Sequence, residues 1–142
     1  MEKNNSGLEA YDLISPERAS KNIGEFAILM PGQEKIVLTK EVIIIRSMVK
    51  DSNFDQFYLM WALSLKAVRE QWKRIVLMQT NREDVGERLY EIKIPVPKTK
   101  LKADTISKYF KNYYDTLAKA RIDLEKNLND DKYKHHFYLS SE

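Results

Sequence analysis

A heptad-spaced set of apolar residues near the C-terminus limits the possible folds more than any other feature of the chain. The set recurs at steps of four and three residues and comprises Ile106, Phe110, Tyr113, Leu117, Ala120 and Leu124. This spacing is typical of the a and d positions of a coiled coil. We call the six residues the heptad seam. They predict a helix over roughly Asp104–Leu128, capped by Asp104 or Thr99, that either pairs with another helix or folds back on a sheet.

The N-terminal third of the chain has the short apolar runs of a small sheet. Strand candidates lie at residues 11–14, 26–30, 35–38 and 42–46, and Ser15-Pro16 is expected to end the first of them. Asn22, Gly24 and Pro31-Gly32 predict turns. The β-branched run Val42–Ile45 suits a strand that is buried on both faces. We therefore expect three or four short strands in a small mixed sheet.

A helical period begins at Asn53 and continues to about Val76. Asn53 with Gln56 resembles a capping box, and Ser64 is expected to end one helix and to cap a second. Aromatic residues, among them both tryptophans, recur on one stripe of this pair. Such a stripe is typical of a helix that packs on a sheet, and it predicts core packing rather than a ligand site.

The segment Gln79–Pro97 connects the helix pair to the long helix. Its acidic residues at 83 and 84 favour the first turn of a short helix, which Gly86 weakens. Ile92–Ile94 is expected to be extended, because Pro95 and Pro97 disfavour helix in the residues that precede them.

The expected fold class is α+β, with a small mixed sheet packed with a helix pair and followed by a long C-terminal coiled-coil-like helix. The expected organisation is a disordered leader at 1–10, an α/β domain at 11–97, a spacer or dimerisation helix at 98–128 and a flexible tail at 129–142.

The composition argues against several classes of function. The chain has no cysteine, so it lacks thiol nucleophiles and disulfides, which fits a reducing cytoplasm. Its two histidines, His135 and His136, are adjacent and would point in different directions, and it has no glycine-rich phosphate loop. No apolar run is long enough to cross a bilayer. We expect a cytoplasmic, non-catalytic protein with no cofactor, no metal site and no membrane partner.

Basic charge is concentrated in parts of the chain. The net charge is +3, yet residues 1–30 are net −2, whereas residues 98–127 carry eight basic and four acidic side chains. Residues 64–78 carry one acidic side chain and four basic ones, namely Lys66, Arg69, Lys73 and Arg74. Local excess of this kind is expected on a surface that faces a polyanion. Solvated helix faces with surplus lysine have the same composition, so this alternative stays open.

Two polar segments contain side chains that are suited to DNA. Arg, Asn and Gln can each make two hydrogen bonds to a base edge, whereas Lys and Thr suit phosphates. The first segment contains Arg18, Ser20, Lys21 and Asn22, and the second contains Gln79, Thr80, Asn81 and Arg82. Polar loops of this kind also occur on ordinary protein surfaces.

The order of these elements resembles one target-recognition domain of the specificity subunit of type I restriction-modification systems. The similar segments are YDLI, ASKNIGEFAIL, VLTKEVIIIR, NFDQFYLMWALSLKAVREQ and QTNREDVGERLYEIKIPVP, followed by the heptad helix, and they cover about residues 11–128. That family has an Ile-Pro-Leu-Pro-like exit into a long helix, and here the exit is Ile94-Pro95-Val96-Pro97. The basic KTKLKAD that follows departs from the acidic, glutamine-containing helix start usual in the family.

The resemblance implies sequence-specific recognition of double-stranded DNA on behalf of a methyltransferase (modification) subunit and a restriction subunit. It implies contacts to DNA bases from Ser15–Asn22 and Gln79–Arg82. It also implies contacts to the DNA backbone from the four basic residues at 66–74. The long helix would act as a spacer and docking surface, with self-association as a further use.

A complete specificity subunit is similar to two such domains with two spacer helices. The chain is therefore expected to be a fragment, a split subunit or the similar domain of an adenine DNA methyltransferase. The alternative is a non-catalytic protein–protein adaptor that docks through the heptad seam and binds no nucleic acid.

Overall fold

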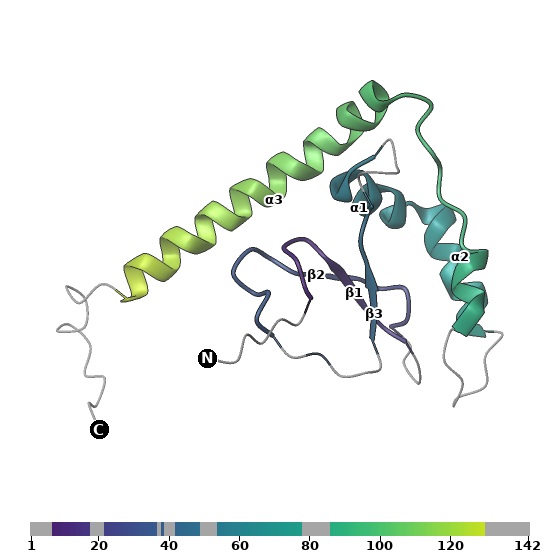
Figure 1. Cartoon of the computed structure of the whole chain (residues 1–142), viewed down its shortest axis with the longest axis horizontal. Helices are drawn as coiled ribbons and strands as arrows, with labels where there is room; N and C mark the ends of the chain where they lie inside the picture. Colours follow the sequence, from purple (N-terminus) through teal and green to yellow (C-terminus); the bar gives the residue numbers. More distant parts are fainter. Residues whose placement is uncertain are drawn as a thin grey trace. The chain divides into compact units, whose positions relative to one another are not determined.

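The computed structural model describes residues 7–17, 22–36, 38, 42–48, 54–77 and 86–129. The chain forms two compact units, residues 1–110 and 111–142. The division falls within the long C-terminal helix, after Phe110, and not at residue 97, where the sequence suggested a boundary. The sheet and the first two helices belong to the first unit (Figure 1).

The described strands form one antiparallel sheet in the order β2-β1-β3 (Figure 1). The strands are β1 (Leu13–Pro16), β2 (Ala27–Ile28) and β3 (Val42–Ile45). Leu13 on the central strand β1 lies opposite Ile28 on one side and Ile45 on the other. The predicted α+β class is confirmed, although the described strands pair in an antiparallel rather than a mixed arrangement.

Three expectations about the strands are wrong. β1 includes Ser15 and Pro16, because the fixed φ of proline is compatible with the last residue of a strand. Residues 35, 36 and 38 lie in turns and loops rather than in a strand. β3 has one neighbouring strand among the described residues, and the side chain of Ile44 is 45% exposed, so β3 is not buried on both faces. The predicted turn at Pro31-Gly32 is confirmed.

An ion pair fixes the residues before β1 to the end of β3. Arg46 Nε donates to Asp12 Oδ1 at 2.7 Å, and Arg46 Nη2 donates to Asp12 Oδ2 at 2.6 Å. Arg46 Nη2 also donates to the Gly7 carbonyl at 2.7 Å, and Arg46 Nη1 lies 3.1 Å from Glu9 Oε1. Residues 7–10, which the sequence assigned to a disordered leader, are therefore tied to the sheet.

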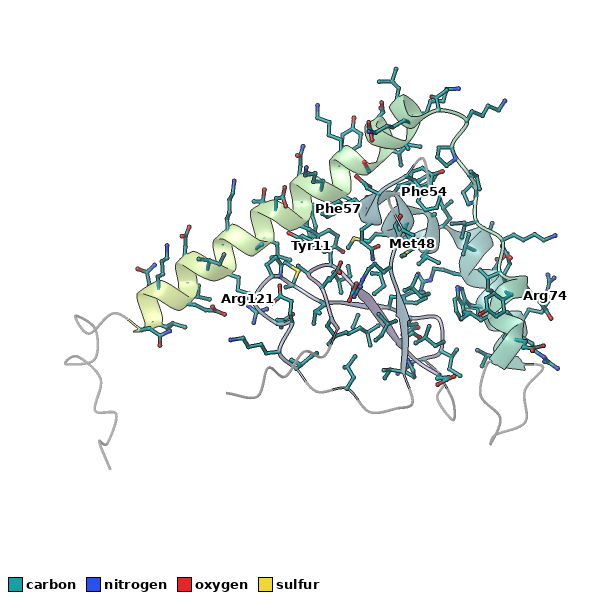
Figure 2. The ribbon with its side chains drawn as sticks, in the orientation of Figure 1. Tyr11, Met48, Phe54, Phe57, Arg74 and Arg121 are labelled. Carbon is teal, nitrogen blue, oxygen red and sulfur yellow. The ribbon has the colours of Figure 1, made fainter. Side chains whose placement is uncertain are left out.

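Helix α1 (Gln56–Ser64) does not begin with the predicted capping box. Its N-cap is Asp55, whose carboxylate accepts from the Tyr58 N–H at 2.9 Å, and Asn53 lies outside the described residues. The Gln56 side chain bonds instead to the backbone of the sheet, accepting from Ser47 N–H at 2.7 Å and donating to the carbonyls of Tyr11 at 2.8 Å and Ile45 at 3.2 Å. Gln56 thereby joins α1 to the ends of β1 and β3. The rings of Tyr11 and Phe57 add a contact at 4.9 Å (Figure 2).

Helix α2 (Lys66–Leu77) packs through its buried residues Val68, Trp72 and Ile75. The ring of Phe26, which precedes β2, meets Trp72 edge-on at 5.5 Å. The predicted helix pair with an aromatic packing stripe is confirmed. Ser64 ends α1 as expected, but it does not cap α2, because its hydroxyl donates back to the Trp61 carbonyl at 2.6 Å.

Side chains rather than strand pairing hold the connection to the long helix. A short 3-10 helix, η1 (Gly86–Glu91), lies within this connection. It begins at the glycine that was expected inside the helix, and the acidic residues 83 and 84, expected in its first turn, lie outside the described residues. The Gln71 amide then donates to the Lys93 carbonyl and accepts from the Lys93 N–H, both at 2.8 Å. The Tyr58 hydroxyl donates to the Pro95 carbonyl at 3.0 Å, and burial raises the pKa of Tyr58, which keeps this donor protonated. Residues 92–97 form no strand.

Helix α3 (Lys100–Asn129) is the predicted long helix, but it begins before Asp104. Thr99 caps it, because its hydroxyl oxygen accepts from the Lys102 N–H at 3.3 Å. Within the first unit, Ala103 forms a buried cluster with two α1 residues, Tyr58 and Ala62, and Ile106 packs against this cluster. No helix of the described residues has both the length and the apolarity that crossing a membrane requires.

Candidate nucleic-acid interface

The exposed face of α2 carries four of the predicted DNA-contacting side chains. They are Lys66, Arg69, Lys73 and Arg74, and all four are exposed. Lys66, Arg69 and Lys73 are spaced by three and four residues, so they follow one side of the helix, and Arg74 lies beside that line. Figure 2 shows Arg74 projecting from α2 on the side away from the sheet. We call these four residues the cationic face.

Little negative charge offsets the cationic face. Glu70 is the acidic residue of α2, and its Oε1 lies 3.9 Å from Lys66 Nζ. Both side chains are well exposed, so this i,i+4 pair contributes at most about 0.5 kcal/mol and opens easily. Within the described part of the chain, no ion pair engages Arg69, Lys73 or Arg74. Three cationic groups are thus available to an anionic partner.

The connection between β1 and β2 ends against the buried side of α2. The hydroxyl oxygen of Ser15, which is fully buried, accepts from the Gly24 N–H at 2.9 Å. A Cβ on Gly24 would lie 2.7 Å from both Cβ and Cγ of Trp72, and Gly24 has a φ of 87°. Both the space and the backbone conformation therefore require glycine at this position. The predicted turn at Asn22–Gly24 is confirmed, with the Glu25 N–H donating to the Asn22 carbonyl at 2.9 Å.

Of the side chains proposed individually as base readers in the two polar segments, Asn22 is the one within the described residues, and it is exposed. It lies two residues before the contact between Gly24 and α2. The other candidates lie outside the described residues, and they are Arg18, Ser20, Lys21, Gln79, Thr80, Asn81 and Arg82. The structure thus brings the end of the first polar segment to α2, the helix that carries the residues predicted to contact the DNA backbone.

Sequence reasoning missed the residues that hold this arrangement together. Ser15 was expected to help end a strand and, by the resemblance, to belong to the base-contacting segment Ser15–Asn22, but it is fully buried and cannot contact a base. Trp72 was expected only in the packing stripe. The glycine-after-asparagine turn was the available signal for Gly24. No sequence signal marks Gln71, whose two bonds to Lys93 attach the exit segment to the same helix.

The heptad seam is divided between the two units. Ile106 packs within the first unit and Phe110 is half-buried, so this end of the seam contributes to the fold itself. The rest of the seam is exposed, with Tyr113 at 62% and Leu124 at 57% of their possible surface. An open hollow of about 430 Å³ lies beside it and is lined by Asn112, Tyr113, Thr116, Leu117 and Ala120. The second unit therefore presents an apolar strip with a recess in it.

No cluster of three or more metal-binding side chains occurs among the residues that the structure describes. No protein-family model matches the chain, and comparisons with curated proteins and with solved structures give no significant match. Its function must therefore be inferred from its own residues.

Proposed function

We propose that the chain is a sequence-specific DNA recognition module that directs a restriction-modification methyltransferase and nuclease complex to its target site. In this proposal the module is cytoplasmic and non-catalytic, and it works as a target-recognition domain of a specificity subunit or of an adenine methyltransferase. The observation that carries the proposal is the cationic face of α2, beside which the β1–β2 connection ends.

The spacing of the cationic face suits a nucleic-acid backbone. Lys66 and Lys73 are separated by seven residues, which corresponds to about 10 Å of helix axis at 1.5 Å per residue. One DNA strand carries about three phosphates over that axial length, because its charges repeat about every 3.4 Å. Cationic side chains on one helix can therefore contact successive phosphates, while base edges are read from neighbouring polar segments.

Base reading in this proposal comes from the two polar segments. Asn22 offers the amide donor and acceptor that pair with adenine in the major groove. Arg18 and the segment Gln79–Arg82 also contain side chains that can hydrogen-bond to base edges. Helix α3 then serves as the spacer on which the modification subunit docks.

Salt-dependent binding to duplex DNA tests the proposal. Each phosphate contact contributes about 0.9 to the slope of log affinity against log salt, so the three cations that no described ion pair engages predict a slope of about −2.7 or steeper. The double charge reversal Arg69→Glu/Lys73→Glu is expected to flatten the slope by about 1.8 and to weaken binding to every duplex sequence.

The matched control is Lys35→Glu/Lys93→Glu, which makes the same change in charge at two exposed positions outside both basic stretches. We expect the control to bind DNA like the wild type. Absence of duplex binding at low salt, both for the chain alone and with its methyltransferase partner, would refute the proposal.

The second candidate function is a protein–protein adaptor that uses the heptad seam. The exposed apolar strip of the second unit, with its recess beside Tyr113, favours this candidate. If the chain is an adaptor, Leu117→Glu/Leu124→Glu abolishes self-association and partner binding in sedimentation, and Arg69→Glu/Lys73→Glu changes neither. If Arg69→Glu/Lys73→Glu loses DNA binding and Leu117→Glu/Leu124→Glu does not, the result instead favours DNA recognition.

A further inference from the structure

We infer that Ser15 is a positioning residue for DNA recognition, because its hydroxyl holds the end of the β1–β2 connection against Trp72 of α2. The inference rests on the proposed function and adds the mechanism that fixes the distance between base-reading and phosphate-binding groups. Neither Ser15 nor Trp72 needs to touch DNA in this mechanism.

The first step is the attachment of the connection to the sheet. Ser15 lies on the central strand β1, where it is paired with Ile43 of β3 and is fully buried. Its Oγ accepts from the Gly24 N–H at 2.9 Å and donates to the Pro16 carbonyl at 3.3 Å. Because Ser15 is fully buried and paired with β3, the oxygen that accepts from the Gly24 N–H is held by the sheet.

The second step is the contact with α2. The absence of a Cβ on Gly24 allows its backbone to reach the Trp72 side chain, which is 2% exposed and is also met edge-on by Phe26. The Trp72 Nε1 atom is buried without a hydrogen-bond partner, so packing alone holds the indole in place. Losing the bond that the Gly24 N–H donates to Ser15 therefore frees Gly24 to move away from the helix.

The third step links this contact to the cationic face. Arg69 lies one helical turn before Trp72 on an adjacent side of α2, so the two positions move together. Asn22 and Gly24 belong to one hydrogen-bonded turn, closed by the bond from the Glu25 N–H to the Asn22 carbonyl. The exposed side chains of Asn22 and Arg69 are therefore held at a set separation through Gly24 and Trp72.

The charge at the end of the connection gives it a different task from α2. Glu25 is exposed beside Gly24, and its carboxylate disfavours a nearby phosphate. A carboxylate and an amide can both bond to base edges, since Glu accepts from cytosine and Asn pairs with adenine. The described end of the connection, Asn22 to Glu25, thus suits base contacts, while the cationic face suits phosphates. Sequence preference then depends on their separation, whereas general affinity depends on α2.

The experiment uses the full chain and a pool of duplexes with randomised sequence. Sequencing the bound fraction of the wild type defines its preferred site, and affinities for that site and for the random pool give a specificity ratio. For Ser15→Ala we expect the ratio to fall about tenfold, which corresponds to one lost base contact. Affinity for the random pool and the salt slope are expected to stay within twofold of the wild type.

Ser107→Ala is the matched control. Ser107 is the other buried serine of the described residues, and its hydroxyl donates within α3 to the Asp104 carbonyl at 3.2 Å. This variant is expected to keep both the ratio and the general affinity. Where Ser15→Ala does not fold at the assay temperature, Ser15→Cys replaces it, because a thiol fills a similar volume and is only a weak acceptor.

The outcomes separate the two levels of the proposal. A preserved specificity ratio in the folded Ser15 variant overturns the positioning role and leaves the proposed function standing. Equal losses of preferred and random binding also overturn it, because they indicate a general defect. If the wild type binds no duplex, or binds every sequence alike, the proposed function itself fails and the positioning role falls with it.

Discussion

Replacing Arg46 with methionine removes the cation that compensates the buried carboxylate of Asp12. Asp12 is 1% exposed, and after the change the donor that its carboxylate keeps is the Glu9 N–H at 2.8 Å. Removing one partner of a buried ion pair costs about 3–5 kcal/mol. Since the Arg46 side chain is itself 31% exposed, water can partly replace it, and we expect a loss of about 3 kcal/mol in the free energy of unfolding, at the lower end of that range.

The pH dependence of this loss identifies its cause. Burial acts to raise the pKa of Asp12, but hydrogen bonds from Arg46 and the Glu9 N–H, with the charge of Arg46, bring it below the usual value. A lowered carboxyl pKa contributes stability that is present above about pH 4 and is lost as the pH falls through the folded-state pKa. Without Arg46, burial raises that pKa, and protonation then relieves the penalty. The difference between wild type and variant should therefore shrink as the pH falls from 7 to 3.

Urea unfolding measures both quantities. With a slope of about 2 kcal/mol per molar urea, the Arg46→Met midpoint should fall by about 1.5 M at pH 7. Arg121→Met is the control, because Arg121 pairs with Glu125 on the surface of α3 at 3.1 Å and both side chains are well exposed. It should cost less than about 0.5 kcal/mol at any pH. A loss below about 1 kcal/mol for Arg46→Met, or a loss that is equal at pH 7 and pH 3, would contradict the argument.

Two further changes test how the elements are joined. Gln71→Ala removes both hydrogen bonds to the Lys93 backbone, and it should lower the free energy of unfolding in urea by about 1–2 kcal/mol. Faster hydrogen exchange at the Lys93 amide would show that the segment before α3 is released. Gly24→Ala should cost about 3 kcal/mol or more in thermal unfolding, because its Cβ would overlap Trp72 and its φ is 87°. Gly32→Ala, with a φ of 92° and open space around its Cβ, should cost only about 1–2 kcal/mol, and equal costs for the two glycines would rule out the overlap with Trp72 as the cause.

The helices were predictable from sequence because their apolar spacing is a local property. The stripe that contains Trp72 defined the helix pair, and the heptad seam defined α3, since both patterns follow directly from helix geometry. The start of α1 was predicted wrongly because Gln56 is used by the sheet, and its three backbone partners there are distant in sequence. Strand ends were also misplaced. The ends of a strand depend on which residues pair with it, and this pairing cannot be read from the local sequence.

The candidate interface was predictable in its charges but not in its assembly. The spacing of Lys66, Arg69 and Lys73 was enough to place them along one side of a helix. The contact between Gly24 and Trp72 joins residues far apart in the chain, and it depends on the absence of an atom. No composition or periodicity signals such a contact.

The bond between Ser15 and Gly24 closes the β1–β2 connection at its base, and this has a consequence for how the chain can change. The two ends are nine residues apart and are held by one hydrogen bond at the sheet and one packing contact at α2. Doubling the length of a closed flexible loop costs only about 0.6 kcal/mol. Insertions inside this connection are therefore inexpensive as long as its two end residues and the buried Ile23 are kept. The β1–β2 connection can therefore vary in length while the sheet and α2 keep the same structure.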